Sequence, residues 1–244
     1  MTEREMVLQG YGASVMPSHQ PQVMDANPML VTSAGPGTGW YLRYGKRAVD
    51  TVLALIALLL LTPLMAMVAF AVLTSVGSPI FFSQTRIGRE GRPFDVYKFR
   101  TMHTDRRTTQ DRRSSNRQAV GQDRRRTHKS AEDPRLTPTG RVLRRLSLDE
   151  LPQLINVLRG QMSLVGPRPE LPSIIERHYE DWHHRRHAVR PGITGLWQIT
   201  ERGNGMMHEH VDVDLDYIDQ VGPLTDLKIL LLTMPAALGS RRGY

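Results

Sequence analysis

The 244-residue sequence contains no cysteine, and only 6% of its residues are aromatic. The lack of cysteine excludes a disulfide framework, a thiolate zinc site and a cysteine nucleophile. Acidic residues are also scarce beside basic ones, with 24 Asp and Glu against 32 Lys and Arg, so the formal net charge is +8. A basic chain attracts nucleic acid, anionic lipid or phosphorylated substrates, and composition alone does not choose among these three.

Charge is absent altogether from Thr51 to Ser83. Thr51–Phe70 alone reaches the length of about 20 apolar residues that a membrane helix needs. One spanning helix is the simplest interpretation. Pro63, directly after Thr62, is expected to break or kink that helix, and the Thr62 hydroxyl is a candidate partner for the backbone groups that the break frees.

The flanks of this apolar run are basic on both sides. They contain Arg43, Lys46 and Arg47 before it, and Arg86, Arg89 and Arg92 after it. A spanning helix normally shows an excess of positive charge on one side only. A helix–break–helix hairpin that enters and leaves the membrane by one leaflet satisfies both the proline and the charges. The residues alone leave the span and the hairpin about equally supported.

Three segments follow from these patterns. Residues 1–42 are predicted to be a disordered leader, because they are rich in Gly, Pro, Ser and Gln and lack the basic start and apolar core of a signal peptide. Residues 43–82 form the membrane helix–break–helix, and residues 83–244 carry the candidate catalytic groups. Within them, residues 103–133 are predicted to be a mobile Arg-rich loop, with no aromatic side chain for stacking on bases.

The periodicity of the remaining chain predicts an α/β fold that is mostly α, with amphipathic helices at the membrane interface. The predicted strands and helices are Ile80–Phe82, Phe94–Phe99 and part of Gly192–Ile199 as strands, and Gly140–Leu148, Glu150–Leu158, Pro172–Arg186, Val211–Val221 and Leu227–Leu238 as helices.

Adjacent carboxylates at Asp149 and Glu150 follow two guanidinium groups, Arg144 and Arg145. Two interpretations compete. In the first, Ser147-Leu148-Asp149-Glu150 is a capping box at the start of a helix. In the second, the basic side chains neutralise a diphosphate, one or both carboxylates hold Mg²⁺ with phosphate oxygens, and one carboxylate attacks phosphorus. The spacing alone favours the capping box.

A second group of polar residues lies around Arg168, which two prolines hold in Gly166-Pro167-Arg168-Pro169-Glu170. A rigidly held arginine suits recognition of phosphate or carboxylate, although a turn with a surface ion pair explains the same pattern. His183, His184 and His187 contain an i, i+4 pair that matches metal-ligand spacing. The neighbouring Trp182 and basic residues favour a solvated or interfacial face there instead.

Taken in order, these blocks resemble the bacterial sugar transferases, the small monotopic phosphoglycosyl transferases. The resemblance covers about residues 43–244, and its other matching blocks are Lys46-Arg47 with Asp50, Thr62-Pro63, Pro79-Ile80-Phe81-Phe82, Lys98-Phe99-Arg100-Thr101-Met102, Asp133-Pro134-Arg135-Leu136-Thr137, Leu151-Pro152-Gln153, Met162-Ser163-Leu164-Val165 and Arg190-Pro191-Gly192-Ile193-Thr194-Gly195. No single block is decisive, but their order and spacing together are specific.

This resemblance implies transfer of a sugar-1-phosphate from a UDP-sugar to polyprenyl (undecaprenyl) phosphate, with release of UMP, as a first membrane step of exopolysaccharide or O-antigen-type assembly. It implies that Asp149 is the nucleophile and that Glu150 helps Asp149 to hold Mg²⁺. Substrate binding falls to the basic residues Arg144, Arg145, Arg168, Lys98 and Arg100.

The resemblance also implies a re-entrant hairpin at Thr62-Pro63 and a catalytic domain on the cytoplasmic face of the bacterial inner membrane. The expected partners are membrane lipid, the two substrates and, as a candidate, a second copy of the chain, but not nucleic acid. Two other functions stay open: a catalytically silent scaffold for polysaccharide assembly, and a membrane-tethered nucleic-acid binder. The sugar itself is left open.

Overall fold

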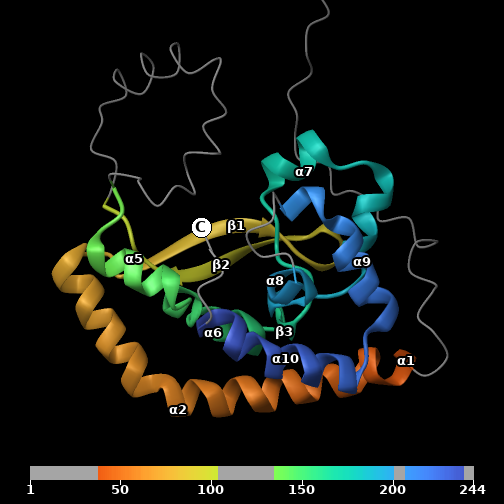
Figure 1. The fold of residues 1–244 in the computed structure, drawn as a ribbon, viewed down its shortest axis with the longest axis horizontal. Helices are drawn as coiled ribbons and strands as arrows, with labels where there is room; N and C mark the ends of the chain where they lie inside the picture. Colours follow the sequence, from red (N-terminus) through yellow and green to blue (C-terminus); the bar gives the residue numbers. More distant parts are fainter. Residues whose placement is uncertain (1–37, 104–134, 201–206, 239–244) are drawn as a thin grey trace, which may run out of the picture.

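A computed structural model of the chain describes residues 38–103, 135–200 and 207–238. The leader up to residue 37 and residues 104–134, which include most of the predicted Arg-rich loop, lie outside these ranges. The fold is mostly helical with two small sheets, as predicted (Figure 1). The helical elements are α1 (Thr38–Trp40), the π-helical turn η2 (Tyr41–Gly45), α2 (Lys46–Ser75), η3 (Arg89–Gly91), α5 (Pro138–Arg145), η4 (Leu148–Glu150), α6 (Gln153–Leu158), α7 (Pro172–His178), η5 (Asp181–Ala188), α8 (Leu196–Thr200), η6 (Met207–Glu209), α9 (Val211–Gln220) and α10 (Pro223–Leu238).

Helix α2 contains the apolar run and is the longest element of the described chain, at 30 residues. It bends part-way along its length (Figure 1), and Pro63 lies in its interior. Proline has no amide hydrogen and displaces the preceding turn, so it accounts for a bend in an otherwise continuous helix. The Thr62 hydroxyl donates to the Leu58 carbonyl at 2.7 Å, one residue before the Leu59 carbonyl that Pro63 leaves free. The structure thus has one bent helix here.

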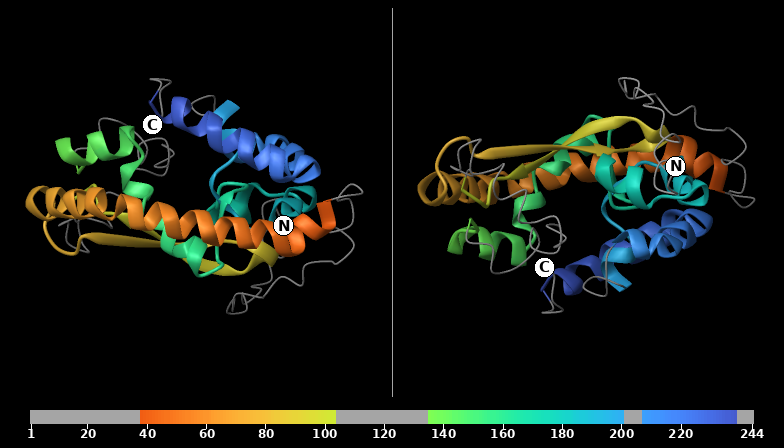
Figure 2. Two further views of the ribbon diagram at one scale, coloured as in Figure 1. Left: turned by 90° about the horizontal axis from the view of Figure 1, so that it is seen from below. Right: turned by 90° about the horizontal axis from the view of Figure 1, so that it is seen from above.

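Strands β1 (Phe81–Ile87) and β2 (Pro93–Phe99) form an antiparallel hairpin in which Phe81 pairs with Phe99. Both views of Figure 2 show this hairpin running along α2. Val96 and Phe99 are both 2% exposed and belong to the buried clusters that also contain α2 side chains. The predicted strands at 80–82 and 94–99 are therefore confirmed, and the first is longer than expected.

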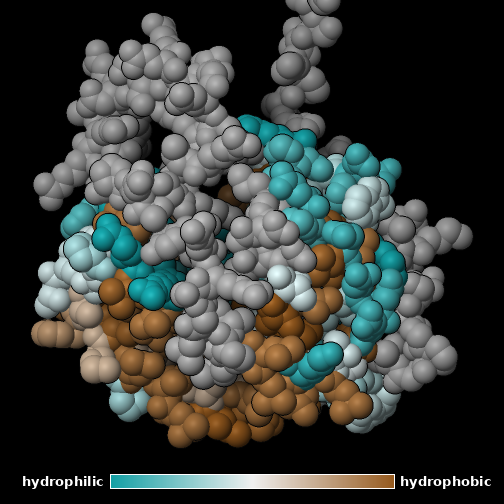
Figure 3. Space-filling model, in the orientation of Figure 1, coloured by the Kyte–Doolittle hydropathy of each residue, from teal (hydrophilic) through white to brown (hydrophobic). Residues whose placement is uncertain are grey.

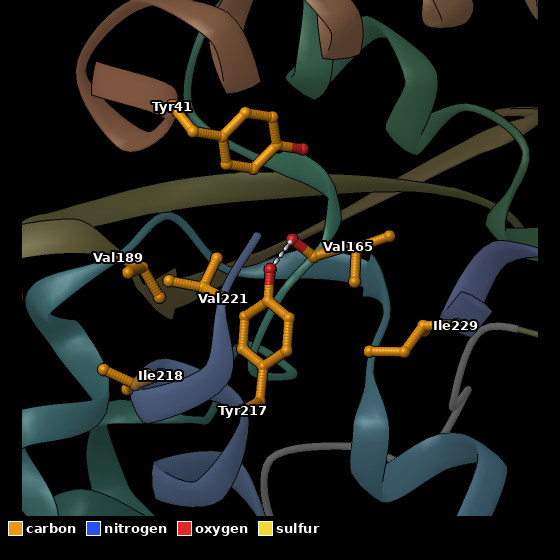
Figure 4. Close-up of a cluster of buried hydrophobic side chains, with 7 residues drawn as sticks. All are labelled: Tyr41, Val165, Val189, Tyr217, Ile218, Val221 and Ile229. Atoms are coloured by element: carbon orange, nitrogen blue, oxygen red, sulfur yellow. Dashed lines mark hydrogen bonds between the residues drawn. The ribbon is translucent and has the colours of Figure 1, made fainter. Parts of the chain in front are cut away.

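A second core lies where η2, directly before α2, meets α9 and α10 (Figure 4). Asp226, at the start of α10, binds Lys46 at 2.5 Å and accepts hydrogen bonds from the Tyr41 and Tyr217 hydroxyls at 2.7 and 2.8 Å. The Tyr217 hydroxyl also lies 3.1 Å from the Val165 carbonyl oxygen. Because a buried ion pair with its oxygens saturated fixes geometry, this network holds α10 against the start of α2. Tyr41 belongs to this core although it falls within the segment assigned as leader.

Two short strands, β3 (Ser163–Val165) and β4 (Gly192–Thr194), pair in parallel and place the Arg168 loop beside the start of α8. Strand β3 was not expected from the sequence pattern. The single helix predicted over Pro172–Arg186 is wrong, because the chain leaves α7 at Tyr179 and restarts as η5. Glu180 explains the restart, since it forms a capping box with His183.

Apolar side chains remain exposed along one edge of the molecule (Figure 3), over α2 and α10. Leu59 and Leu60 of α2 are 67% and 74% exposed, and Leu224 and Leu231 of α10 are 80% and 66% exposed. The helical stretch Tyr41–Ser75 is long and apolar enough to cross a membrane, and most of it is not buried by the rest of the chain. An apolar face of this size requires a covering phase or partner.

Candidate functional site

The paired carboxylates lie on a single 3₁₀ turn, η4, between α5 and α6. Ser147, the residue before the turn, has φ 56° and ψ 20°, a left-handed conformation, and its side chain makes no capping hydrogen bond to η4. The capping box suggested by Ser147 and Glu150 is therefore not formed. A left-handed serine costs free energy, and such strained positions tend to persist where surrounding contacts fix a functional geometry.

Two cations hold the Glu150 carboxylate. Lys98 of β2 donates to Oε1 at 2.6 Å, and Arg168 donates through Nη2 to Oε1 at 2.5 Å and through Nη1 to Oε2 at 3.3 Å. Burial opposes ionisation of Glu150, but the charges and hydrogen bonds of Arg168 and Lys98 outweigh it and hold the pKa of Glu150 well below its usual range. Glu150 is thus held in the ionised form, and its Oε2, with a single contact at 3.3 Å, is the less occupied of its two oxygens.

Asp149 has a different environment from its neighbour, although the two residues are adjacent. It is 8% exposed. Burial raises the pKa of Asp149 to about 6, with a further rise from the negative charge of Glu150, while Lys98 and Arg144 act in the opposite direction. Paired groups whose pKa values are pushed apart by their surroundings usually have separate chemical roles.

Arg144 is positioned toward the dyad from the last turn of α5. Helix α5 begins at Pro138, a favoured residue for the first helical position. The preceding Thr137 caps it, because its hydroxyl accepts a hydrogen bond from the Gly140 amide at 2.9 Å. A Cβ on Gly140 would lie 2.1 Å from the Thr101 carbonyl oxygen. Glycine at this position therefore allows α5 to approach the segment that follows β2. Arg144 Nε then donates to the Thr101 hydroxyl at 3.0 Å.

Two other predicted substrate-binding residues are placed differently. Arg145 is exposed on the last turn of α5. Arg100 donates to the carbonyls of Ser78 at 3.0 Å and Met102 at 3.2 Å, which ties it to the loop before β1. The structure therefore brings Lys98, Arg144 and Arg168 together around the dyad. These hydrogen bonds of Arg100 are instead made to backbone carbonyls.

The loop that carries Arg168 is supported by a second, fully buried ion pair. Arg186 of η5 is 3% exposed and pairs with Asp214 of α9, which is 1% exposed, through Nη2–Oδ2 at 2.5 Å. The same nitrogen donates to the Arg168 carbonyl at 2.7 Å. This pair was missed in the sequence because its members are 28 residues apart and neither lies in a recognisable motif.

A cavity of about 180 Å³ opens beside Glu150 and Arg168. Its apolar walls include Ala57 and Leu61 of α2. Its polar lining consists of Ser147, Glu150, Arg168, Thr194, Gln198 and Thr233. The last three were also missed, because threonine and glutamine carry no charge and no periodic signal that would distinguish them from ordinary packing residues. The cavity joins the charged site to the apolar helix α2.

Among the described ranges, no three His, Asp or Glu side chains converge as a preformed metal site, and that includes the histidines of η5. Mg²⁺ is commonly held by only one or two carboxylates together with substrate phosphates. Asp149 and Glu150 supply the hard oxygen donors that this cation prefers, so the donor set fits Mg²⁺ bound together with a diphosphate.

The comparisons with known proteins agree with this geometry. The family model described as bacterial sugar transferase matches residues 41–240. The chain belongs to the bacterial sugar transferase family. It is 42% identical over 200 residues to the exopolysaccharide production protein ExoY of Sinorhizobium fredii, which covers 82% of this chain and 88% of the relative.

Two longer relatives have more specific names. The chain is 40% identical over 206 residues to the UDP-glucose:undecaprenyl-phosphate glucose-1-phosphate transferase of Escherichia coli, covering 82% of this chain and 41% of that protein. It is 40% identical over 210 residues to the undecaprenyl-phosphate glucose phosphotransferase of Komagataeibacter xylinus, covering 82% of this chain and 37% of that one. The chain therefore spans less than half the length of these two sugar transferases. The family prediction made from the sequence is confirmed.

Proposed function

We propose that the protein transfers a sugar-1-phosphate from a UDP-sugar to undecaprenyl phosphate and releases UMP. The observation that carries the proposal is the division of roles in the dyad: Glu150 is bound by Lys98 and Arg168, whereas Asp149 is buried with a raised pKa beside Arg144. The names of the E. coli and K. xylinus relatives support the same acceptor and the same type of transfer.

The reaction takes two steps on Asp149. Its carboxylate attacks the phosphorus that bears the sugar, the bond from that phosphorus to the bridging oxygen breaks, and UMP leaves with the bonding electrons. The acceptor phosphate oxygen then attacks the same phosphorus. The acyl-phosphate bond breaks, and Asp149 returns as a free carboxylate. A covalent intermediate allows a water-soluble donor and a lipid acceptor to use the site in turn.

The basic side chains around the dyad stabilise the charge that develops during transfer. Arg144 is placed to bind phosphate oxygens, and Arg168 and Lys98 keep Glu150 fixed and ionised. Mg²⁺ would be held by Asp149 and Glu150 with the diphosphate, and would supply further neutralisation of the phosphate charge when bound.

A membrane location follows from the acceptor and from the apolar face of α2 and α10. We place the site on the cytoplasmic surface of the inner membrane, where nucleotide sugars are available, with α2 as a re-entrant helix whose two ends stay on that side. Support comes from Pro63 in the bend and from basic residues at both ends of the run.

The absence of native cysteine allows a direct test of this topology. Tyr44→Cys and Ser83→Cys place single thiols at exposed positions before and after helix α2. In intact cells or inverted vesicles, a membrane-impermeant maleimide should label both positions from the cytoplasmic side and neither from the outside. Labelling of the two positions from opposite sides would show that α2 spans the bilayer.

The raised pKa of Asp149 predicts how the first step depends on pH. Only the carboxylate attacks, so adduct formation from donor alone should rise with pH around a midpoint near 6. One unit below that midpoint, about one-tenth of the maximal rate should remain. Rapid-quench measurement of the adduct without acceptor isolates this step. Lys98→Met should move the midpoint upward, since Lys98 lowers the pKa of Asp149. A midpoint near 4 in the wild-type protein would contradict the assignment.

The test of the overall proposal is a UMP-release assay with purified protein, Mg²⁺, undecaprenyl phosphate and a panel of UDP-sugars. We expect UMP release with at least one UDP-hexose and a radiolabelled lipid-linked product. No UMP from any of the common UDP-sugars would overturn the proposed function.

A further inference from the structure

One side-chain atom of a residue that lines the cavity beside the dyad has no hydrogen-bond partner among the described residues. Gln198, on α8, donates through Nε2 to the Ile193 carbonyl at 2.7 Å. This bond fixes the carboxamide, and its other atom, Oε1, is buried without a hydrogen-bond partner among the described residues. An unsatisfied buried carbonyl costs free energy, and because Gln198 lines one wall of the cavity, a ligand there that donates to this oxygen would remove that cost.

The threonines on the same wall are also acceptors. Thr233 donates its hydroxyl hydrogen to the Ile229 carbonyl at 2.7 Å. The 2.8 Å contact between the Thr194 and Thr233 hydroxyls is therefore donated by Thr194. Both hydroxyl hydrogens are used within the protein, and the lone pairs that remain accept. With Gln198 Oε1, this wall offers hydrogen-bond acceptors and calls for a ligand with several donors.

The other walls identify which part of a substrate fits. Glu150 and Arg168 line the same cavity, so its occupant lies next to the phosphate chemistry. Leu61, Ile193 and Ile199 provide apolar surface. A pyranose ring has both properties, since its hydroxyls donate and its C–H faces are apolar. A volume of about 180 Å³ is small beside the roughly 300–1,000 Å³ of a drug-sized site, which suits one monosaccharide better than a whole nucleotide sugar.

We propose that this cavity binds the sugar ring of the donor, with Gln198 Oε1 accepting a hydrogen bond from one sugar hydroxyl and thereby contributing to the choice of sugar. This inference rests on the proposed function, because it places the sugar of the transferred group. The first isoprene unit of the acceptor is the competing occupant, since Ala57 and Leu61 belong to the membrane helix. An isoprene unit has no hydrogen-bond donor and would leave Gln198 Oε1 unsatisfied.

The experiment combines a side-chain change with changes in the substrate. Gln198→Met keeps the length of the side chain and removes the acceptor. Initial rates of UMP release are measured with the UDP-hexose that the wild-type protein uses best, and with its monodeoxy analogues, each lacking one hydroxyl. We expect Gln198→Met to lower kcat/KM for the parent donor by about 10- to 100-fold. One deoxy donor lacks the hydroxyl that Gln198 binds. With that donor, kcat/KM of the variant and of the wild type should differ by less than about threefold, because the hydrogen bond is already missing.

The controls separate this role from a structural one. Gln220→Met makes the same change at an exposed position at the end of α9, and should leave rates with all donors unchanged. Thr194→Val, which is nearly isosteric, is the second variant if Gln198→Met fails to fold. Its loss of kcat/KM should likewise disappear with one monodeoxy donor and remain with the others. Equal loss with every donor would overturn the inference, and so would an effect confined to the KM for undecaprenyl phosphate.

The failures of the two proposals are distinguishable. A wild-type protein that releases no UMP with any UDP-sugar removes the proposed function and this inference together. A wild-type protein that is active, but in which neither Gln198→Met nor Thr194→Val couples to a donor hydroxyl, removes only the assignment of the cavity.

Discussion

Asp149→Asn should abolish turnover while leaving the fold intact. The substitution keeps the shape of the side chain and removes the nucleophilic oxygen anion, so UMP release should fall by at least ~10³-fold, as for other covalent catalysts that lose their nucleophile. With donor alone, intact-protein mass spectrometry should show an added sugar phosphate on the wild-type chain, lost with Asp149→Asn.

The direction in which Asp149→Asn changes the stability of the fold can also be predicted. Because burial raises the pKa of Asp149 to about 6, the ionised side chain is disfavoured in the folded state. A group with a raised pKa favours folding at low pH and loses that contribution as pH rises through about 6. At pH 7 a neutral asparagine removes an unfavourable buried charge, so the Tm in detergent should be unchanged or higher. A capping or purely structural Asp149 would instead give a lower Tm.

Asp216→Asn is the matched control for this experiment. It makes the same chemical change on the exposed face of α9 and should alter neither the rate nor the Tm. The assignment of the nucleophile fails if an Asp149→Ala protein turns over at the wild-type rate, or if the adduct maps to another residue.

The hydrogen-bond partners of Glu150 could not be predicted from the local sequence. Ser147 and Glu150 have the spacing of a capping box, which local spacing alone favours. In the structure, Glu150 is taken by Lys98 and Arg168, which lie 52 and 18 residues away, and Ser147 is left-handed. Three charge-assisted hydrogen bonds from two cations outweigh one capping bond, and such long-range partners have no periodicity in the chain.

Features with strong local signals were predicted well. The apolar run of α2 and the two strands of the β1–β2 hairpin were recognisable because long apolar runs and short apolar segments are strong local signals. The short strand predicted within Gly192–Ile199 is confirmed as β4, whereas its partner β3 was missed, since three residues are too few to alternate visibly. The pairing of β3 with β4 nevertheless brings together the two segments that lead to Arg168 and to Gln198.

The family resemblance, rather than local spacing, favours the proposal that Asp149 and Glu150 form a catalytic dyad. The blocks recognised in the sequence were short segments from β2, η4, the Arg168 loop and β4. Three of these four segments contribute a residue to the charged site, and β4 lines the cavity beside it. The supporting pair of Arg186 and Asp214 lay outside those blocks, and its role depends on a fold that the pattern did not specify.

Arg168→Lys is expected to lower kcat/KM by about 10²-fold although it keeps the positive charge. Arg168 binds both oxygens of Glu150 through its two terminal nitrogens, and lysine offers a single nitrogen that cannot reproduce this geometry. Displacement of a positioned group by about 1 Å is enough for a loss of this size. Arg177→Lys, on the exposed side of α7, is the matched control and should retain full activity.

Comparison with Arg168→Met separates charge from geometry. Arg168 lowers the pKa of Asp149, so its removal should shift the pH midpoint of adduct formation upward, whereas lysine should leave the midpoint close to that of the wild type. The two variants should therefore share a low rate and differ in pH profile. If Arg168→Lys retains the wild-type rate, the two-point contact with Glu150 is not needed for transfer. If instead Arg168→Met leaves the midpoint unchanged, the charge of Arg168 does not act on Asp149, and its role is confined to positioning Glu150.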